Sequence, residues 1–206
     1  MILALVRHAK SVSNELKILS DDYDKYPLTE EGIRQAEEVA NEIKKIGPEM
    51  IFSSPVLRAR QTAEIIANRL GLKVVIDERL RERGLGELNG KSVLQDGDHW
   101  KLRLARSLEE VKGLESWDSL KARMLDFLDY VSKLEFTSVV AVSHYDPIRA
   151  LVSAFFGLSD FQSWGISIPN ASITLIGMKS SPKVLGIGMP LLPEEVLEAL
   201  KLEGYI

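Results

Sequence analysis

The chain has 206 residues, 45% of them hydrophobic and 27% charged, a composition that is typical of globular proteins and excludes a disordered or fibrous chain. Its net charge of -4 at pH 7 excludes a global basic field, so we expect no nucleic-acid partner, and any anion must be bound by a local cluster. The sequence contains no cysteine, which excludes disulfides, a thiolate nucleophile and a thiolate metal site.

A strand and a helix are predicted in the first quarter of the chain. Residues 2–6 are apolar and rich in β-forming side chains, which indicates a strand buried on both faces. The run is too short for a signal peptide or a membrane span, so we expect a cytoplasmic protein without a membrane partner. Thr29 is the expected N-cap of a helix that Gly47 and Pro48 end. The buried face of this helix is expected to contain Ile33, Ala36, Val39, Ala40 and Ile43.

The same alternation continues toward the middle of the chain. Residues 50–53 predict a second strand, and a helix with a face of small residues follows and ends at Gly71. Residues 74–76 predict a third strand. Residues 92–114, which include His99 and Trp100, are polar and poorly periodic. We interpret them as an insertion over one edge of the domain.

The last part of the chain predicts another strand between two helices. Residues 138–142 are apolar and are followed closely by His144, and a long amphipathic helix begins near Trp117. Asp146 is expected to cap the helix that follows, with Pro147 at its first position. Two closing strands and a terminal helix are expected over 172–178, 184–189 and 194–202.

This order of elements predicts the fold class. Alternating strands and helices indicate an α/β fold, a three-layer sandwich in which helices flank a mostly parallel central sheet. No linker, repeat or low-complexity tract interrupts residues 1–206, so we expect a single domain. In such sheets, ligands bind beyond the carboxyl ends of the strands.

Charged and imidazole side chains follow three of the predicted strands. Arg7 and His8 follow the first strand, Arg58 comes shortly after the second, and His144 follows the late strand. We expect these side chains to meet at one rim of the sheet. The two guanidinium groups match phosphate oxygens, and the imidazoles offer a nucleophile and a hydrogen-bond donor. Two further donors lie close to His8 in the sequence, Ser11 and Asn14.

Five blocks in the sequence carry a resemblance to a known family. They are RHAKSVSN (7–14), PLTEEG (27–32) with Gln35-Ala36, the run from SSP (53–55) to QTA (61–63), ERGLGELNG (82–90), and Ser143-His144 with Ile148-Arg149. In this order they resemble the motifs of the histidine phosphatase superfamily, the phosphoglycerate mutase-like proteins. One departure is Ala9, where relatives usually have glycine, which requires a negative backbone φ angle at this position.

The resemblance implies a mechanism that the residues could support. His8 would attack phosphorus and become a phosphohistidine, while Arg7, Arg58 and His144 would stabilise the charge on the transferred group. Glu82 would protonate the leaving oxygen and then activate water. The scheme needs no metal and no cofactor, and the partner it implies is a small phosphorylated substrate.

Two other residues in or near these blocks each have two possible roles. Arg83 is a candidate substrate-binding residue or a partner in a surface salt bridge, and Tyr145 would line the pocket or cover the core. We expect Arg149 to be a structural anchor. Arg60 is expected to pair with Glu64, four residues further along the helix.

Three functions are compatible with the sequence. The leading expectation is metal-independent hydrolysis of small phosphomonoesters through a phosphohistidine on His8. The alternative is a cofactor-dependent phosphoglycerate mutase, which the absence of a tryptophan before Asn14 and the short chain disfavour. The third is a non-catalytic binder of a phosphorylated ligand. Apolar residues around Phe161 and Trp164 are compatible with a homodimer contact.

Overall fold

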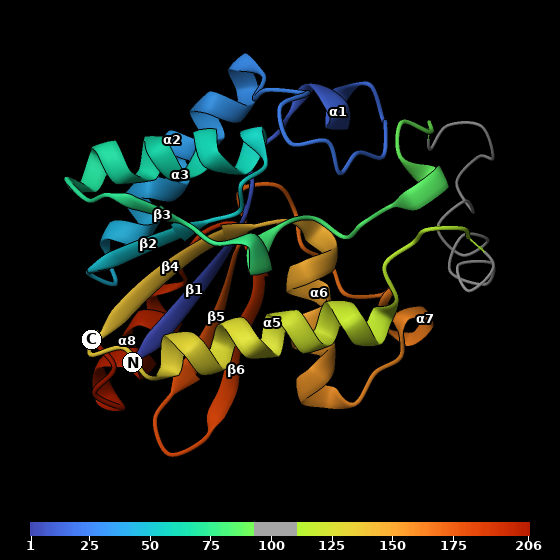
Figure 1. Ribbon diagram of the computed structural model, residues 1–206. Helices are drawn as coiled ribbons and strands as arrows, with labels where there is room; N and C mark the ends of the chain where they lie inside the picture. The colour runs from blue at the N-terminus through green and yellow to red at the C-terminus, as the bar shows by residue number, and fades with distance from the viewer. Residues whose placement is uncertain (93–110) are drawn as a thin grey trace.

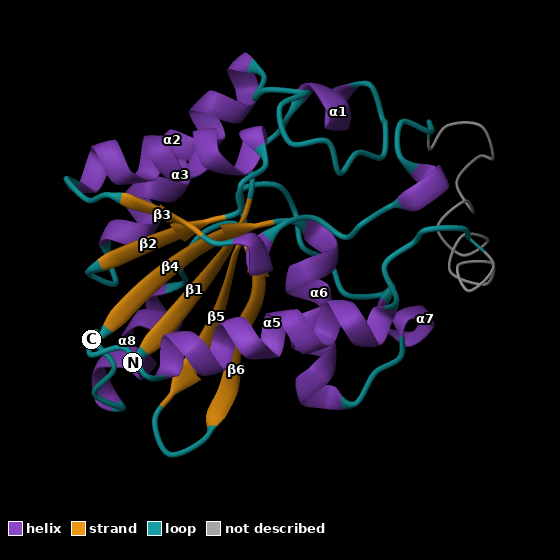
Figure 2. Cartoon of the chain, viewed as in Figure 1, coloured by secondary structure: helices purple, strands orange, loops and turns teal. Residues whose placement is uncertain are grey.

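The computed structural model describes residues 1–92 and 111–206 (Figure 1). These residues fold around one six-stranded sheet with the strand order β3-β2-β4-β1-β5-β6. Helices cover both faces of the sheet (Figure 2), which confirms the predicted three-layer α/β sandwich. The strands are β1 (Ile2–Arg7), β2 (Met50–Ser53), β3 (Val74–Ile76), β4 (Ser138–Ser143), β5 (Ile173–Met178) and β6 (Pro182–Met189).

The helices begin and end close to where the sequence predicts. Thr29 caps α2, and its Oγ1 accepts from the Gly32 N–H at 3.0 Å. Gly71 ends α3 in the left-handed conformation. The predicted insertion at 92–114, with His99 and Trp100, lies for the most part outside the described residues. The helices are α1 (Val12–Glu15), α2 (Glu30–Lys44), α3 (Leu57–Leu70), α5 (Trp117–Ser132), α6 (Tyr145–Phe156), α7 (Asp160–Ser163) and α8 (Glu194–Leu202), with the short 3-10 turns η1 (Glu78–Leu80) and η2 (Gly86–Leu88).

The sheet is mixed. Strands β3, β2, β4 and β1 are parallel to one another, whereas β5 pairs antiparallel with β1 and β6 antiparallel with β5. Arg7 at the end of β1 is in register with Ser143 at the end of β4, and Val6 is in register with Ile173 at the start of β5. The carboxyl ends of the parallel strands therefore meet the amino end of β5 at one edge.

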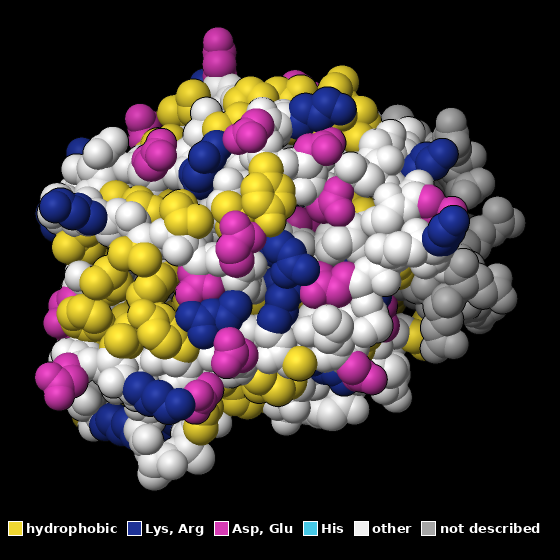
Figure 3. All heavy atoms as spheres, viewed as in Figure 1, with side chains coloured by type: hydrophobic (Ala, Val, Ile, Leu, Met, Phe, Trp, Pro, Cys, Tyr) yellow, Lys and Arg dark blue, Asp and Glu magenta, His cyan; other side chains and the backbone are white. Residues whose placement is uncertain are grey.

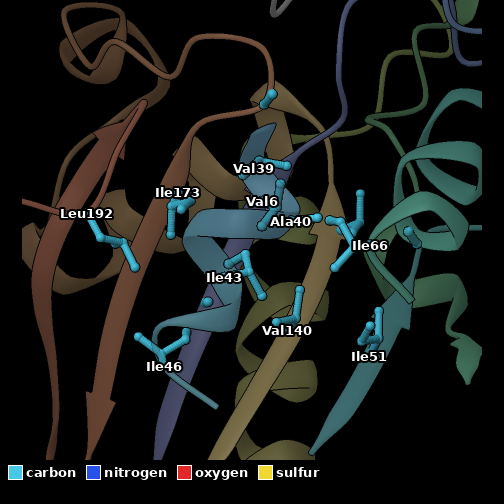
Figure 4. Packing of buried hydrophobic residues seen from close by; sticks show 14 of the residues in the cluster. Val6, Val39, Ala40, Ile43, Ile46, Ile51, Ile66, Val140, Ile173 and Leu192 are labelled. Carbon is cyan, nitrogen blue, oxygen red and sulfur yellow. The ribbon is translucent and has the colours of Figure 1, made fainter. Parts of the chain in front are cut away.

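Alternation along the strands divides the core into two layers. Ala4 and Val6 of β1 face α2, α3 and α8, while Leu3 and Leu5 face α5 and α6. Figure 4 shows the first layer, in which apolar side chains from α2 and α3 pack against the sheet. Both layers consist of side chains that are almost entirely removed from water, which is the main favourable contribution to folding. The packed layers hold the strand ends in fixed positions.

Three predictions about individual residues are corrected by the structure. Ile33 was expected on the buried face of α2, but it is 43% exposed. Arg60 was expected to pair with Glu64, but its guanidinium pairs with Asp24, in the loop before α2, at 2.9 Å. His144 is the N-cap of α6 and Asp146 lies in the first turn of this helix, so Asp146 is not the cap.

The surface agrees with the mild net charge. Figure 3 shows basic and acidic side chains interspersed over one face of the molecule, without a continuous basic area. Among the described residues, no helix is both long and apolar enough to cross a membrane.

Candidate active site

The predicted site residues meet at the edge where β1, β2 and β4 end. The His8 N–H donates to the carbonyl of Ser143 at 2.9 Å, and the Ser54 N–H donates to that of Val142 at 2.9 Å. These bonds extend the sheet by one residue at each strand end. As a result the rings of His8 and His144 lie with their centroids 5.1 Å apart.

His8 is a buried neutral imidazole with one ring nitrogen toward Arg58. Its Nδ1 lies 2.8 Å from the carbonyl oxygen of Ala9, and because a carbonyl can only accept, Nδ1 carries the hydrogen. Nε2 is therefore the unprotonated nitrogen, and Arg58 Nε donates to it at 3.2 Å. Burial, followed by the positive charges of Arg58 and Arg7, lowers the pKa of His8 well below its usual value. This is the protonation state that a nucleophilic imidazole requires.

The two arginines keep part of their hydrogen-bonding capacity free. Arg58 Nη2 donates to the Ser20 carbonyl at 2.8 Å and Arg7 Nη1 to the Ile168 carbonyl at 2.7 Å. Within the described chain, Arg58 Nη1 and Arg7 Nε are buried and have no hydrogen-bond partner. Unpaired buried donors are costly, so their presence beside His8 indicates a place for an anion.

His144 is fully buried next to His8. Its Nε2 is 2.8 Å from the hydroxyl of Ser54, and that hydroxyl also accepts from the Val56 N–H. The Nδ1 of His144 has no hydrogen-bond partner among the described residues. Burial, and then the charge of Arg58, lowers the pKa of His144 well below its usual value. The second imidazole is therefore also neutral and can act as a donor without adding charge.

Glu82 completes the charged set from the segment that follows η1. Its Oε1 accepts from the Arg83 N–H at 2.9 Å, and its Oε2 lies 3.8 Å from Arg58 Nη2 and 3.7 Å from His144 Nδ1. Burial, and then the negative charge of Asp146, raises the pKa of Glu82 to about 7. A carboxyl group with such a pKa can both donate and accept a proton near neutral pH.

Asn14 and Ser11 have different roles in the structure. The Asn14 Oδ1 accepts from the N–H and the hydroxyl of Ser11, at 3.0 Å each. Because the oxygen is occupied, the amide nitrogen of Asn14 remains for a ligand, and Asn14 lines the pocket. Ser11 is completely buried and is absent from the pocket lining. Ser11 was expected to bind substrate, but its hydroxyl positions Asn14 instead.

Residues of the sequence blocks hold the loop after His8. Thr62 Oγ1 accepts from the Ala9 N–H at 3.0 Å, and Gln35 Oε1 accepts from the Lys10 N–H at 2.9 Å. A Cβ atom on Gly32 would come within 1.9 Å of the Lys10 carbonyl oxygen, so this close approach requires glycine. Ala9 is not among the residues with positive φ, which confirms that alanine is tolerated there.

Asn170 is a site residue that the sequence analysis missed. Its Nδ2 donates to the His8 carbonyl at 3.0 Å and to Asn14 Oδ1 at 3.1 Å. The next residue, Ala171, has a φ of 54° and its N–H donates to the carbonyls of Arg7 and His8. A strained residue at a functional site is one that the surrounding contacts hold in place. The turn before β5 therefore clamps the backbone of His8.

Arg83 and Tyr145 line the pocket, and both are fixed by bonds on their far side. Arg83 is 3% exposed and its Nη1 donates to Asp160 Oδ2 at 2.8 Å. The ion pair is thus buried and is not the surface pair considered from the sequence. The Tyr145 hydroxyl donates to the Ile166 carbonyl at 3.0 Å, and its ring lies 5.3 Å from the Arg7 guanidinium.

Arg149 is the anchor behind this wall, as predicted. It is fully buried and donates to one oxygen each of Asp146 and Asp160, at 2.8 Å. Its guanidinium also lies 4.4 Å from the rings of Trp117 and Trp164. Asp146, which lines the pocket, is therefore ion-paired with Arg149.

These residues enclose a pocket of about 270 Å³. Its floor is formed by Arg7, His8, Asn14, Arg58 and Glu82, and Tyr145 lies at its side. The described residues contain no group of three or more side chains suited to hold a metal ion. The floor can bind a dianion between the two arginines, present a nucleophilic nitrogen to it, and supply or remove a proton through Glu82.

Known proteins resemble this chain over most of its length. The sequence model of the histidine phosphatase superfamily (branch 1) matches residues 3–186. The chain is 36% identical over 203 residues to a 2,3-bisphosphoglycerate-dependent phosphoglycerate mutase of Thermoplasma acidophilum, covering 98% of this chain and 99% of the other. It is 35% identical over 190 residues to a putative phosphoserine phosphatase of Hydrogenobacter thermophilus, covering 89% and 92%.

A solved structure shows the same fold. A mycobacterial glucosyl-3-phosphoglycerate phosphatase in complex with VO3 superposes with a TM-score of 0.78 at 27% identity, covering 92% of this chain and 98% of the other. The length of one relative corrects an expectation about the mutase. A relative named as a mutase has nearly the length of this chain, so a short chain does not disfavour that reaction.

Proposed function

Because the chain belongs to the histidine phosphatase superfamily, we propose that it hydrolyses small phosphomonoesters without a metal, through a phosphohistidine at Nε2 of His8. The observation that carries the proposal is the state of the pocket floor. A neutral buried imidazole faces guanidinium N–H groups that have no partner within the described chain. A carboxyl group with a pKa of about 7 lies next to them.

In the first step, the phosphoryl group moves from the ester to the enzyme. Its oxygens bind to Arg7, Arg58 and the amide nitrogen of Asn14, and Nε2 of His8 attacks phosphorus. The P–N bond forms as the P–O bond to the alcohol breaks. The leaving oxygen takes the proton of Glu82, so the alcohol departs neutral. The arginines stabilise charge on the transferred group, which is the main protein contribution to phosphoryl transfer.

In the second step, water replaces the alcohol. Glu82, now a carboxylate, removes a proton from a water molecule that attacks phosphorus opposite His8. The P–N bond breaks, inorganic phosphate forms, and His8 returns to the neutral state. Glu82 is then protonated and ready for another turnover. Glu82 donates a proton in the first step and accepts one in the second, and a pKa near neutrality permits both.

The mutase is the second candidate, and the mutase relative at 36% identity favours it. A mutase would share the first step but return the phosphoryl group from His8 to a second hydroxyl. Against it stands the absence of a tryptophan before Asn14, where the residue is Ser13.

Phosphate release from a panel of phosphomonoesters, with EDTA present, tests hydrolysis. The parallel assay follows isomerisation of 3-phosphoglycerate with 2,3-bisphosphoglycerate as primer. Steady phosphate release without a primer supports the phosphatase. Isomerisation that needs the primer, with little phosphate release, supports the mutase. Binding of vanadate with neither reaction would identify a non-catalytic binder.

The clamp by Asn170 gives a prediction on positioning. Asn170→Ala removes the donor to the His8 carbonyl and to Asn14, so we expect kcat to fall about 10- to 100-fold through misplacement of the reacting groups. Asn170→Asp keeps the size but presents an acceptor to two acceptors, and it should lose as much or more.

The control for this prediction is Asn41→Ala, on the exposed side of α2, where the amide accepts from Arg69. Steady-state kinetics of the three variants, with thermal unfolding measured in parallel, separate positioning from stability. Unchanged kcat in folded Asn170→Ala would refute a positioning role.

A further inference from the structure

Part of the pocket lining is apolar, in contrast to the charged and polar residues of the floor. Besides the arginines and His8, the pocket lining includes six apolar residues, which come from four separate segments of the chain. They are Ile18, Leu19, Leu85, Leu88, Leu114 and Trp164. We call this set the apolar wall. It lines the same pocket as the phosphate-binding floor.

Backbone hydrogen bonds hold one side of the apolar wall in place. After α1 the chain turns at Lys17, which has a φ of 53°, and the Ile18 N–H donates back to the Ser13 carbonyl at 2.8 Å. The Leu19 N–H then donates to the Lys91 carbonyl at 2.9 Å, and the Leu19 carbonyl accepts from the Gly90 N–H at 2.8 Å. This side of the wall is therefore preformed.

The segment that contributes Leu85 and Leu88 is fixed in the same way. Leu85 forms an isolated antiparallel bridge with Leu114, and the Leu85 N–H donates to Asp21 Oδ2 at 2.8 Å. Leu85 is 7% exposed although it borders the pocket. Leu88 lies one 3-10 turn further on, with its N–H donating to the Leu85 carbonyl. An apolar ligand could thus be bound with little ordering of the protein, which favours affinity.

The charged groups near the wall are already paired. Arg83 is bonded to Asp160, and Asp146 is bonded to Arg149. Lys17 lies at the rim, where it is exposed. Above the floor, none of the charged pocket-lining residues that the structure describes is both buried and unpaired. A second anionic group on a substrate would therefore lose water against apolar side chains without a buried cation to replace it.

We infer that the leaving-group side of the pocket accepts an apolar organic group, so that the preferred substrates are phosphomonoesters of aromatic or branched aliphatic alcohols rather than of small hydroxy acids such as glycerate. This inference rests on the proposed function, since it assigns the alcohol part of the same ester. The floor selects the phosphoryl group, and the apolar wall selects what it is attached to. Small ligand sites commonly combine a few placed polar groups with a mainly apolar lining.

The test compares esters of primary alcohols that differ in the wall-facing group. We expect kcat/KM for benzyl phosphate to exceed that for glycerol 3-phosphate and 3-phosphoglycerate by at least about 10-fold, the scale of discrimination that an apolar pocket gives. Leu88→Asn should reduce the ratio of benzyl phosphate to glycerol 3-phosphate about 10-fold. Leu16→Asn is the matched control, because Leu16 is 53% exposed and is not a pocket residue. It should leave the ratio unchanged.

Lys17→Met tests the competing substrate class. If 3-phosphoglycerate is the best substrate and Lys17→Met removes that preference, the rim lysine binds a carboxylate and the inference is overturned. Equal kcat/KM for the three esters, with Leu88→Asn behaving like Leu16→Asn, also overturns it.

A binding experiment separates this inference from the proposed function. The dissociation constants of benzylphosphonate and methylphosphonate, which are not hydrolysed, report on the apolar wall without turnover. Binding of benzylphosphonate at least about 10-fold tighter supports the apolar wall even if no ester releases phosphate. Equal affinities contradict it, even if the enzyme is an active phosphatase.

Discussion

Replacement of His8 by alanine is expected to abolish phosphate release from every ester. The loss should be the largest of any single substitution, on the order of 10⁶-fold, because removing a nucleophile costs about as much as removing the whole catalytic set. The variant retains Arg7 and Arg58, which are also held by hydrogen bonds to the carbonyls of Ile168 and Ser20. We therefore expect it still to bind vanadate or inorganic phosphate.

The measurement combines turnover with chemical trapping. Wild-type protein quenched during turnover should carry one phosphoryl group that is stable in alkali and labile in acid, as expected for a phosphohistidine. His8→Ala should carry none, and His99→Ala, which changes a histidine that has no role in the proposed mechanism, should be labelled as the wild type is. Phosphate release from His8→Ala at a wild-type rate would reject the proposed nucleophile.

The sequence predicts the floor of the site because the ends of buried strands can be recognised from the pattern of apolar residues. A short apolar run that stops at a polar or charged residue marks a strand leaving the core, and three such runs end at Arg7, Ser53 and Ser143. What the pattern does not contain is the order of the strands. That the second and late strands are neighbours, with Ser53 beside Val142, depends on contacts between distant segments.

Asn170 shows the consequence of this gap. The site residues predicted from the sequence follow the carboxyl ends of strands, because ligands bind there in parallel sheets. Strand β5 is antiparallel to β1, so its amino end reaches the same edge and brings Asn170 to the backbone of His8. The polarity of a strand depends on its pairing, and the residues of 173–178 are apolar in either direction.

The ion pairs around Arg149 show a second gap. From the sequence, Asp146 is a good helix cap and Arg83 a candidate ligand or surface residue. In the structure, Arg149 lies buried between Asp146 and Asp160, and the latter also binds Arg83. Such a network forms only when α6, α7 and the segment after η1 converge. Local propensity therefore placed these residues near the site but did not identify their partners.

The pH dependence of kcat/KM should follow Glu82. The first step needs Glu82 protonated and His8 neutral. The pKa of Glu82 is raised to about 7. The enzyme with protonated Glu82 therefore predominates below this pH, and it is lost as the pH rises through this value. The pKa of His8 is lowered well below its usual value, so the imidazole stays neutral on the acid side. We expect kcat/KM to decline above about pH 7.

Glu82→Gln should remove this decline and lower kcat for alkyl phosphates by about 100- to 10,000-fold, the usual contribution of a general acid and base. Glutamine retains an oxygen that can accept from the Arg83 N–H, so the fold around it is preserved. The ionisation of the substrate itself is common to both proteins, and comparing their profiles isolates the carboxyl group. Glu87→Gln, on the exposed side of η2, is the matched control.

The two steps can be separated with an ester whose alcohol needs no proton. With p-nitrophenyl phosphate, transfer to His8 should remain fast in Glu82→Gln, whereas attack by water, which needs the carboxylate as a base, should be slow. A rapid burst of one equivalent of nitrophenol followed by slow turnover is then expected, with phosphohistidine accumulating during the slow phase. If nitrophenol instead forms at the wild-type steady rate, some group other than Glu82 activates the water. The burst is thus a test of the carboxyl group in its second role, independent of its role toward the leaving oxygen.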